Sequence, residues 1–330
     1  MTTKVRNSNF ELLRIIAMLF IVIWHISIHA QRGELATHNI AIAFTTTGVN
    51  LFVLISGYFN IKINWKGLLT LASTVAFYTF ATVTCKWCIT GKTPMPGEIA
   101  GILAPICNTR WWFINSYFHL MLFSPVINLI LEKATNKQYK YFLITLLFMS
   151  CISGFCLKNL INLNGYNTFQ FITMYTLGDA IRRFNLTNKF SKKHLLTAYL
   201  LCTLCLFVSS FIAARTIFYN NPLVIVAAVC LFCLVAKLEF SNRTVNYIAS
   251  FMLPIYLLQD SCVGFIAYKY LYDIGVITNF KGFDYCTLIF IYLLILTTSA
   301  FILDWLRRVF LKHPITAISK FLDKKFNLFN

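Results

Sequence analysis

Charged residues are scarce in this sequence, and acidic residues are the scarcest of them. Asp, Glu, Lys and Arg make up 12% of the chain, and only 11 of its 330 residues are Asp or Glu. An ordinary soluble protein carries about 25% charged residues. Hydrophobic residues reach 58% here and aromatic residues 16%. This composition excludes a soluble protein with a large core and predicts a polytopic membrane protein.

Other absences narrow the class further. The first apolar segment contains Arg14 and His25. It is longer than the apolar part of a secretory signal and lacks a small-residue cleavage site, so we expect no cleavable signal peptide. No internal repeat is recognisable, which disfavours the inverted-repeat transporter folds. Even the longest outer segments, 91–110 and 269–283, are too short to fold as separate domains.

The apolar segments predict an all-α membrane protein with about ten transmembrane helices. If the N-terminus is cytoplasmic, most of the 29 Lys and Arg residues fall on the cytoplasmic side. The positive-inside rule then places both termini in the cytoplasm. The predicted spans are residues 9–30, 39–59, 67–90, 111–131, 140–157, 168–182, 195–214, 222–237, 246–268 and 284–305.

The formal net charge of +18 has two interpretations. Such a charge can attract nucleic acid or another acidic partner. Because the basic residues follow the predicted topology, we interpret them as an orientation signal and expect no nucleic-acid partner. From Arg307 to Asn330, Lys alternates with Phe, Leu and Ile, which predicts a basic amphipathic helix on the inner leaflet, with membrane lipids as partners. The chain then divides into a membrane domain, 1–306, and a cytoplasmic tail, 307–330.

Cysteine spacing points to no metal site. Three C-x-x-C pairs begin at Cys85, Cys202 and Cys230, and this spacing in a soluble loop would suggest zinc or redox chemistry. The last two pairs lie in the middle of apolar spans without a second pair of ligands nearby. We interpret them as small apolar residues on helix faces and expect no metal.

The first predicted span carries a polar stripe. Arg14 and His25 are eleven positions apart, which on a helix is three turns plus about 20°, so both side chains share one face. Glu11 and His29 fall within about 60° of Arg14 on the same wheel. Each charged group in hydrocarbon costs about 2.5–3.5 kcal/mol on insertion scales. A chain that retains such a stripe is expected to use it.

Each member of the stripe also has a structural interpretation. Glu11 and Arg14 are i,i+3 neighbours and can form an ion pair at the helix end, with Arg14 extending to the interface. His25 lies about 16 Å further along the axis, near mid-bilayer. It can be a core histidine bonded to a neighbouring helix. Alternatively, its neutral imidazole can accept a proton from a hydroxyl group.

Polar residues recur in three later spans. The second span combines two glycines with amide and hydroxyl side chains, which suits either helix packing or substrate binding. The fourth span opens with aromatic residues that form either an interfacial belt or a platform for a sugar ring. The ninth span is polar in its outer half. The candidate substrate-binding residues in these spans are Asn50, Ser56, Trp112, Tyr117 and Gln259.

In their order and spacing, these motifs resemble the acyltransferase family 3 membrane proteins. The resemblance covers essentially the whole chain, including the ten-span layout. It rests on the Arg-x10-His spacing of the first span, the run 48–58, the segment 112–125 from Trp-Phe to Ser-Pro, the Phe-x3-Tyr-x-Leu-Gly pattern at 171–178 and Ile-Tyr-Leu at 255–257.

The resemblance implies that the protein is an O-acyltransferase and that it spans the inner (cytoplasmic) membrane several times. The family moves an acyl group, usually acetyl, from cytoplasmic acyl-CoA to hydroxyls of cell-surface polysaccharides or their lipid-linked precursors. Acyl-CoA is then a donor substrate, and no bound cofactor is expected. The resemblance also implies that Arg14 and His25 are the functional pair. Two positions depart from the family pattern, because Asn50 stands where an acid is common and Gln259 where many members have His.

The resulting hypothesis gives three residues of the stripe a role. Arg14, oriented by Glu11, holds the phosphate end of the donor, and His25 acts as general base on the acceptor hydroxyl. An acyl-histidine relay is a variant of this mechanism. Two other classes remain open from the sequence. They are a transporter or flippase of a lipid-linked sugar or small solute, and a non-catalytic sensor or assembly partner with the same fold.

Overall fold

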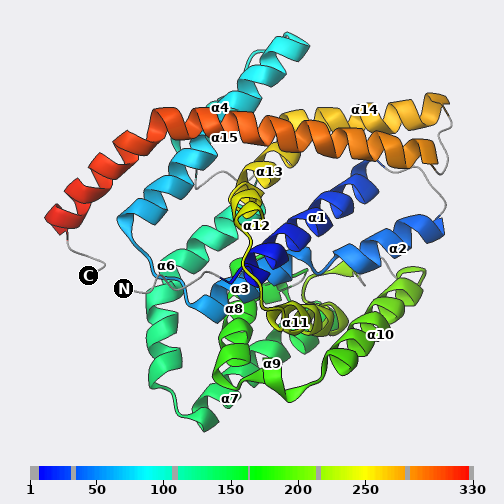
Figure 1. The fold of residues 1–330 in the computed structure, drawn as a ribbon, viewed down its shortest axis with the longest axis vertical. Helices are drawn as coiled ribbons and strands as arrows, with labels where there is room; N and C mark the ends of the chain where they lie inside the picture. Colours follow the sequence, from blue (N-terminus) through cyan, green and yellow to red (C-terminus); the bar gives the residue numbers. More distant parts are fainter. Residues whose placement is uncertain are drawn as a thin grey trace. The chain divides into compact units, whose positions relative to one another are not determined.

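The computed structural model describes residues 7–30, 35–105, 111–162, 164–212, 217–278 and 283–326. It is 84% helical, and these described residues contain no β-strand. Figure 1 shows the succession of helices along the chain. The prediction of an all-α protein is therefore confirmed.

Within the described ranges, seven helical segments are long and apolar enough to cross a membrane. A further pair, Arg243–Gln259 and Cys262–Ile274, is bent by 73° and makes an eighth if it counts as one span. Two of the ten predicted spans are short. At 1.5 Å per residue, α8 (Thr168–Arg183) and α11 (Pro222–Ala236) extend about 24 and 22 Å, against about 30 Å of hydrocarbon. The count of ten stays a prediction.

The chain forms two compact units that interleave along the sequence. The first, unit 1, comprises Met1–Ser27, Glu34–Ile61 and His119–Ser250. The second, unit 2, comprises Ile28–Gly33, Lys62–Phe118 and Phe251–Asn330. Two helices, α1 (Asn9–His29) and α6 (Trp112–Lys133), contribute residues to both.

Most helices belong to unit 1. Besides α1, α8, α11 and the larger part of α6, the described elements of this unit are α2 (Leu35–Thr45), α3 (Gly48–Phe59), α7 (Asn136–Leu147), the π-helix η2 (Phe148–Cys156), the short 3-10 turn η3 (Leu160–Asn162), α9 (Leu186–Lys189), α10 (Lys192–Ser210) and α12 (Arg243–Ala249).

Two glycines let α3 and α8 pack backbone to backbone. A Cβ on Gly57 would lie 1.9 Å from the carbonyl oxygen of Tyr175, and a Cβ on Gly178 would lie 2.3 Å from that of Leu54. Only residues without a side chain allow this approach, as in the small-residue contacts of membrane helices. Since residues 54–57 face residues 175–178, the two helices end side by side.

The helix α1 runs against α3 and α11. Near its middle, Gly48 of α3 approaches the carbonyl oxygen of Ala17. Near its start, the ring of Phe10 lies 5.1 Å from that of Tyr58 at the end of α3. The Asn9 side-chain amide donates to the carbonyl of Ala236, the last residue of α11, at 3.0 Å. These contacts agree with the alternating directions predicted for the spans. The side of the membrane that each end faces stays a prediction.

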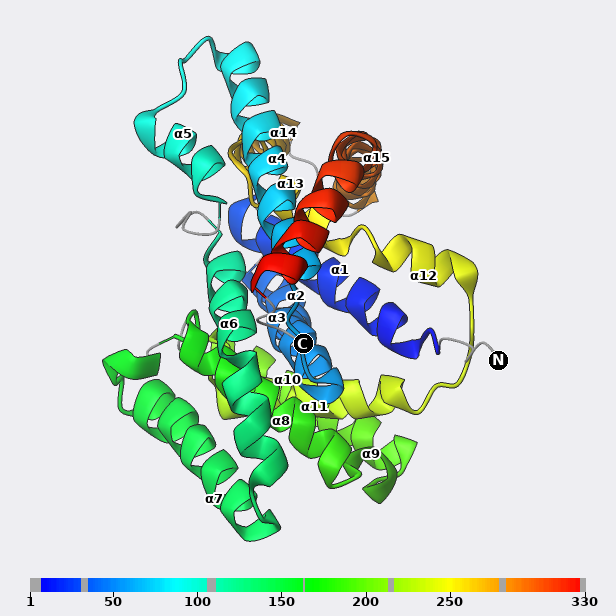
Figure 2. The ribbon, with the colours of Figure 1, turned by 90° about the vertical axis from the view of Figure 1, so that its left-hand side faces the viewer.

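The helices of unit 2 are α4 (Trp65–Thr90), α5 (Pro96–Leu103), α13 (Met252–Gln259), α14 (Cys262–Thr278), α15 (Phe283–Phe326) and the first turns of α6. The chain after α4 turns back so that α5 lies beside its end (Figure 2), where Lys86 forms an ion pair with Glu98 at 2.6 Å. The Tyr78 hydroxyl of α4 donates to the carbonyl of Ala300 in α15 at 3.3 Å.

The last helix joins the final predicted span to the predicted tail. It has 44 residues, or about 66 Å, and Figure 1 draws it as one continuous ribbon from orange to red. This is about twice the thickness of the hydrocarbon layer, so a large part of it lies outside that layer or along its surface. The helix passes residue 306 without a break, and the separate role of 307–330 as a surface tail stays a prediction.

Candidate active site

The polar stripe predicted on the first span lies on one uninterrupted helix, α1. At its start, Nη1 of Arg14 donates to Oε1 of Glu11 at 2.5 Å. The Glu11 side chain is 7% exposed, whereas the Arg14 side chain is 32% exposed. The buried carboxylate therefore holds a guanidinium that still reaches the surface. This is the orientation required of a residue that binds an anion.

His25 is fixed to its own helix. Its Nδ1 lies 2.8 Å from the carbonyl oxygen of Ile21. A carbonyl can only accept a hydrogen bond, so Nδ1 carries the hydrogen in this contact. In the neutral ring, Nε2 is then the basic atom. The side chain is half-buried, and it sits about 16 Å along the axis from Arg14.

Trp24, the residue before this histidine in α1, contacts an aromatic segment from elsewhere in the chain. The indole ring of Trp24 meets the imidazole of His25 edge-on at 5.2 Å, and it lies 6.5 Å from the ring of Tyr219. Tyr219 also packs against Tyr166 at 4.7 Å. Burial raises the pKa of Tyr166, which lies outside the helices, to about 12, so its phenol is neutral at physiological pH. The helix α1 thus packs next to His25, through Trp24, on the aromatic residues Tyr166 and Tyr219.

Asn50 holds that aromatic segment in place. Its side-chain amide donates to the carbonyl of Tyr219 at 2.9 Å, and the amide of Gln170 donates to the same oxygen at 2.9 Å. Asn50 is buried, and so is Gln170. The two amide groups therefore connect α3 and α8 to the segment that contacts Trp24. This bond gives Asn50 a positioning role for the segment.

Buried amides gather around this connection. Ser150 donates to Gln170 at 2.6 Å, and Asn162 donates to both, at 2.8 and 3.0 Å. Asn220 donates to the carbonyl of Asn162. These residues come from three separate stretches of sequence, which is why the sequence did not suggest a cluster. The available signal was weak: each is an amide or hydroxyl in or next to an apolar segment, where polar groups need partners.

The remaining predicted residue of unit 1 bonds within its own helix. The Ser56 hydroxyl donates to the carbonyl of Phe52 at 3.0 Å. The predicted site residues that belong to unit 1 are Glu11, Arg14, His25, Asn50 and Ser56.

Unit 2 contains the other three predicted residues, Trp112, Tyr117 and Gln259. Tyr117 stacks on Phe113 at 5.9 Å with an interplanar angle of 8°, and Trp112 meets the same ring edge-on at 6.2 Å. Gln259 is fully buried, and its Oε1 accepts from the Tyr268 hydroxyl at 3.4 Å. Its Nε2 has no partner among the described residues.

Metal ligands are not gathered anywhere in the described part of the chain. No group of three or more His, Cys, Asp or Glu side chains there could hold a metal ion. The described cysteines, which include all three C-x-x-C pairs, are free thiols.

Comparison with known proteins gives one match. Residues 7–305 match the family described as an acyltransferase domain. The matched region includes α1 with its stripe, the amide cluster and every other candidate residue. No curated protein and no solved structure matches the chain significantly.

Proposed function

Because this chain belongs to acyltransferase family 3, we propose that it is a membrane O-acyltransferase that transfers an acyl group from acyl-CoA to a carbohydrate hydroxyl. The acceptor is a cell-surface polysaccharide or its lipid-linked precursor, the acyl group is acetyl, and the protein acts in the inner (cytoplasmic) membrane. The observation that carries the proposal is the placement of an oriented arginine and a tethered histidine on one helix of the matched domain.

The donor lies along α1 in this proposal. Arg14 binds the phosphate groups of CoA, because a planar guanidinium pairs with two phosphate oxygens and stays charged at all physiological pH values. Glu11 orients it at 2.5 Å. The axial distance from Arg14 to His25, about 16 Å, is comparable with the extended pantetheine arm. A donor anchored at Arg14 therefore places its thioester beside the imidazole.

His25 acts on the acceptor as a general base. Its Nε2 takes the proton of the acceptor hydroxyl while the oxygen attacks the thioester carbon. The hydroxyl O–H bond and the thioester C–S bond break, and the ester C–O bond forms. The proton then passes from Nε2 to the departing CoA sulfur. The Nδ1 bond to Ile21 keeps the ring in the required tautomer throughout.

The test compares membranes of cells that contain the wild-type protein, His25→Ala or no protein, at matched protein levels. Cells are supplied with isotope-labelled acetate, and ester-linked acetyl on the surface glycan is measured by NMR before and after mild alkali. We expect a base-labile ester with the wild type alone. An ester that is equally abundant without the protein would contradict the proposal. Movement of an unmodified glycan across the membrane, without any ester, would favour a transporter instead.

A further inference from the structure

We propose that Arg182 is a second anchor for the phosphate groups of the acyl-CoA donor, held in place by the buried carboxylate of Asp179. This inference rests on the proposed function and adds a residue to the donor site. The sequence offered no reason to select Arg182 among the 29 basic residues.

The acid–arginine pair of α1 is repeated on α8. Asp179 and Arg182 have the same i,i+3 spacing as Glu11 and Arg14, and Nη2 of Arg182 contacts Oδ1 of Asp179. Both acids are buried, with side chains that are 3% and 7% exposed, and both arginines reach the surface, at 50% and 32%. Each pair thus presents an arginine that a buried carboxylate orients.

Both pairs lie at the same end of unit 1. The first turn of α1 packs on the end of α3 through Phe10 and Tyr58, whose rings are 5.1 Å apart. Asn60, which follows α3, also reaches α8. In the orientation that satisfies both of its side-chain atoms, the Asn60 amide accepts from Nη2 of Arg182 at 2.9 Å. The end of α3 therefore lies between the two pairs.

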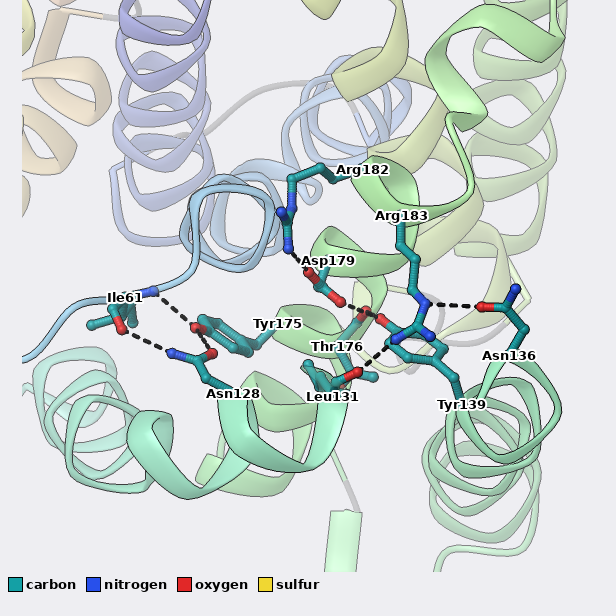
Figure 3. A network of polar contacts seen from close by, with 10 residues as sticks. All are labelled: Ile61, Asn128, Leu131, Asn136, Tyr139, Tyr175, Thr176, Asp179, Arg182 and Arg183. Carbon is teal, nitrogen blue, oxygen red and sulfur yellow. Dashed lines mark hydrogen bonds and ion pairs between the residues drawn. The ribbon is translucent and has the colours of Figure 1, made fainter. Parts of the chain in front are cut away.

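The carboxylate of Asp179 is locked from its other side. The Tyr139 hydroxyl lies 2.9 Å from its Oδ2 and 2.8 Å from the carbonyl of Thr176. Figure 3 shows Asp179 between the tyrosine and Arg182. A buried carboxylate with both oxygens bonded cannot turn away, so it fixes the guanidinium and leaves one face of it toward the surface. Among the described residues, no contact engages Nη1 or Nε of Arg182.

The neighbouring arginine has the opposite arrangement. Arg183 donates through Nη1 to Leu131, through Nη2 to Ala134 and through Nε to Asn136, at 2.5, 2.7 and 3.1 Å. Its guanidinium also lies over the ring of Tyr139 at 4.6 Å. All its nitrogens are therefore used to close the turn between α6 and α7 (Figure 3). Arg183 is structural, whereas Arg182 keeps donors for a ligand.

A second bonded triad makes this end rigid. The Tyr175 hydroxyl donates to Oδ1 of Asn128 at 2.7 Å and accepts from the backbone N–H of Ile61 at 2.8 Å. The Asn128 amide donates to the carbonyl of Ile61 at 3.0 Å. The segment that follows α3 is thereby tied to α6 and to the middle of α8, as Figure 3 shows. An anion that binds Arg182 therefore meets a preorganised site, so little conformational entropy is lost on binding.

The experiment measures binding of acetyl-CoA and of phosphate-free S-acetylpantetheine to purified full-length protein in lipid-free detergent. We expect Arg182→Gln to weaken acetyl-CoA binding by about tenfold or more through loss of a charge-assisted hydrogen bond. Binding of S-acetylpantetheine is expected to stay the same. Arg182→Lys should recover part of the loss, and Asp179→Asn should show a smaller loss because the guanidinium is no longer held. Lys189→Gln removes an exposed positive charge of α9 and serves as the control.

Four outcomes would overturn the proposal. Unchanged acetyl-CoA affinity in Arg182→Gln, with a loss in Arg14→Gln, would remove Arg182 from the site and leave the proposed function intact. Equal loss of both probes would mean that Arg182 is structural. If Arg182→Gln instead weakens binding of added phosphatidylglycerol and spares acetyl-CoA, the anion is a lipid headgroup. Failure of the wild type to bind either probe would reject the acyl-CoA donor itself, and with it the proposed function.

Discussion

The imidazole of His25 has one nitrogen tied to its helix, and this limits what a substitution can preserve. Nδ1 bonds the carbonyl of Ile21 at 2.8 Å, so a glutamine at this position can retain a donor of similar size while losing the basic nitrogen. We expect His25→Gln to lower kcat at least about 10²-fold, the range of general-base catalysis. The donor KM should change little. The measurement is transfer of labelled acetyl from acetyl-CoA to glycan in membranes, with thermal unfolding as a check. A variant with full activity would exclude His25 as the base.

Arg14 differs from a simple positive charge because its planar fork can bind two phosphate oxygens. Arg14→Lys keeps the charge and loses the fork, so the donor KM should rise about tenfold while most of kcat remains. The matched control is Arg243→Lys, the same change at an exposed arginine that begins α12. Steady-state kinetics with varied acetyl-CoA separate the two constants. An unchanged KM in Arg14→Lys would contradict the anchoring role.

Asn50 is one of the two positions at which the sequence departs from the pattern that it resembles, and its contacts give an amide there a physical reason. Its amide donates to the carbonyl of Tyr219 at 2.9 Å, and a carboxylate has no hydrogen to donate there. Asn50→Asp would place an acceptor against an acceptor in a buried position. We expect a loss of about 1–3 kcal/mol in stability and no such loss for Asn188→Asp on the exposed surface. Thermal unfolding in detergent measures the stability of both variants. Equal stability would mean that the bond from Asn50 to Tyr219 contributes nothing.

At the scale of elements, the contact between α3 and α8 depends on the absence of a side chain. A Cβ on Gly57 would stand 1.9 Å from the backbone oxygen of Tyr175, and a backbone atom cannot move aside as a flexible side chain can. We expect Gly57→Ala to cost at least the about 1–3 kcal/mol typical of overpacking. Gly97→Ala in α5 is the control, because a Cβ there meets nothing within 4 Å. The yield of monodisperse protein and its Tm measure both variants, and a folded Gly57→Ala protein with wild-type Tm would contradict this packing.

Sequence reasoning succeeded for elements whose signal is local. Long apolar runs and the continuous stripe of α1 follow from composition and helical period, which need no knowledge of neighbours. Sequence reasoning was less informative where contacts between distant segments determine the structure. The 16 residues of α8 carry a buried aspartate, Asp179. Its charge is compensated by Arg182 of the same helix and by Tyr139 of α7, and only the fold shows the second partner. The bend of 73° between α13 and α14 likewise has no clear local cause in the sequence.

The site could be predicted in part for the same reason. Glu11, Arg14 and His25 share one helix, so their spacing alone brought them into one stripe. The contact between Trp24 and Tyr219 could not be anticipated, because these residues are far apart in sequence and meet only in the fold. Asn50 was selected for the right reason, a polar group in an apolar span, but its partner is the backbone of Tyr219. Arg182 was one basic residue among many until Asp179 and Tyr139 distinguished it.

At the scale of the whole molecule, the mechanism depends on orientation in the membrane. Arg14 can meet cytoplasmic acyl-CoA only if the start of α1 faces the cytoplasm, and the basic residues predict this arrangement with both termini inside. We expect green fluorescent protein fused after Asn330 to fluoresce and alkaline phosphatase at the same position to be inactive. The phosphatase requires an oxidising compartment, so inserted between Lys92 and Thr93, in the turn between α4 and α5, it should be active. The reverse pattern would place Arg14 on the outer side, where acyl-CoA is absent, and the donor would then have to be another molecule.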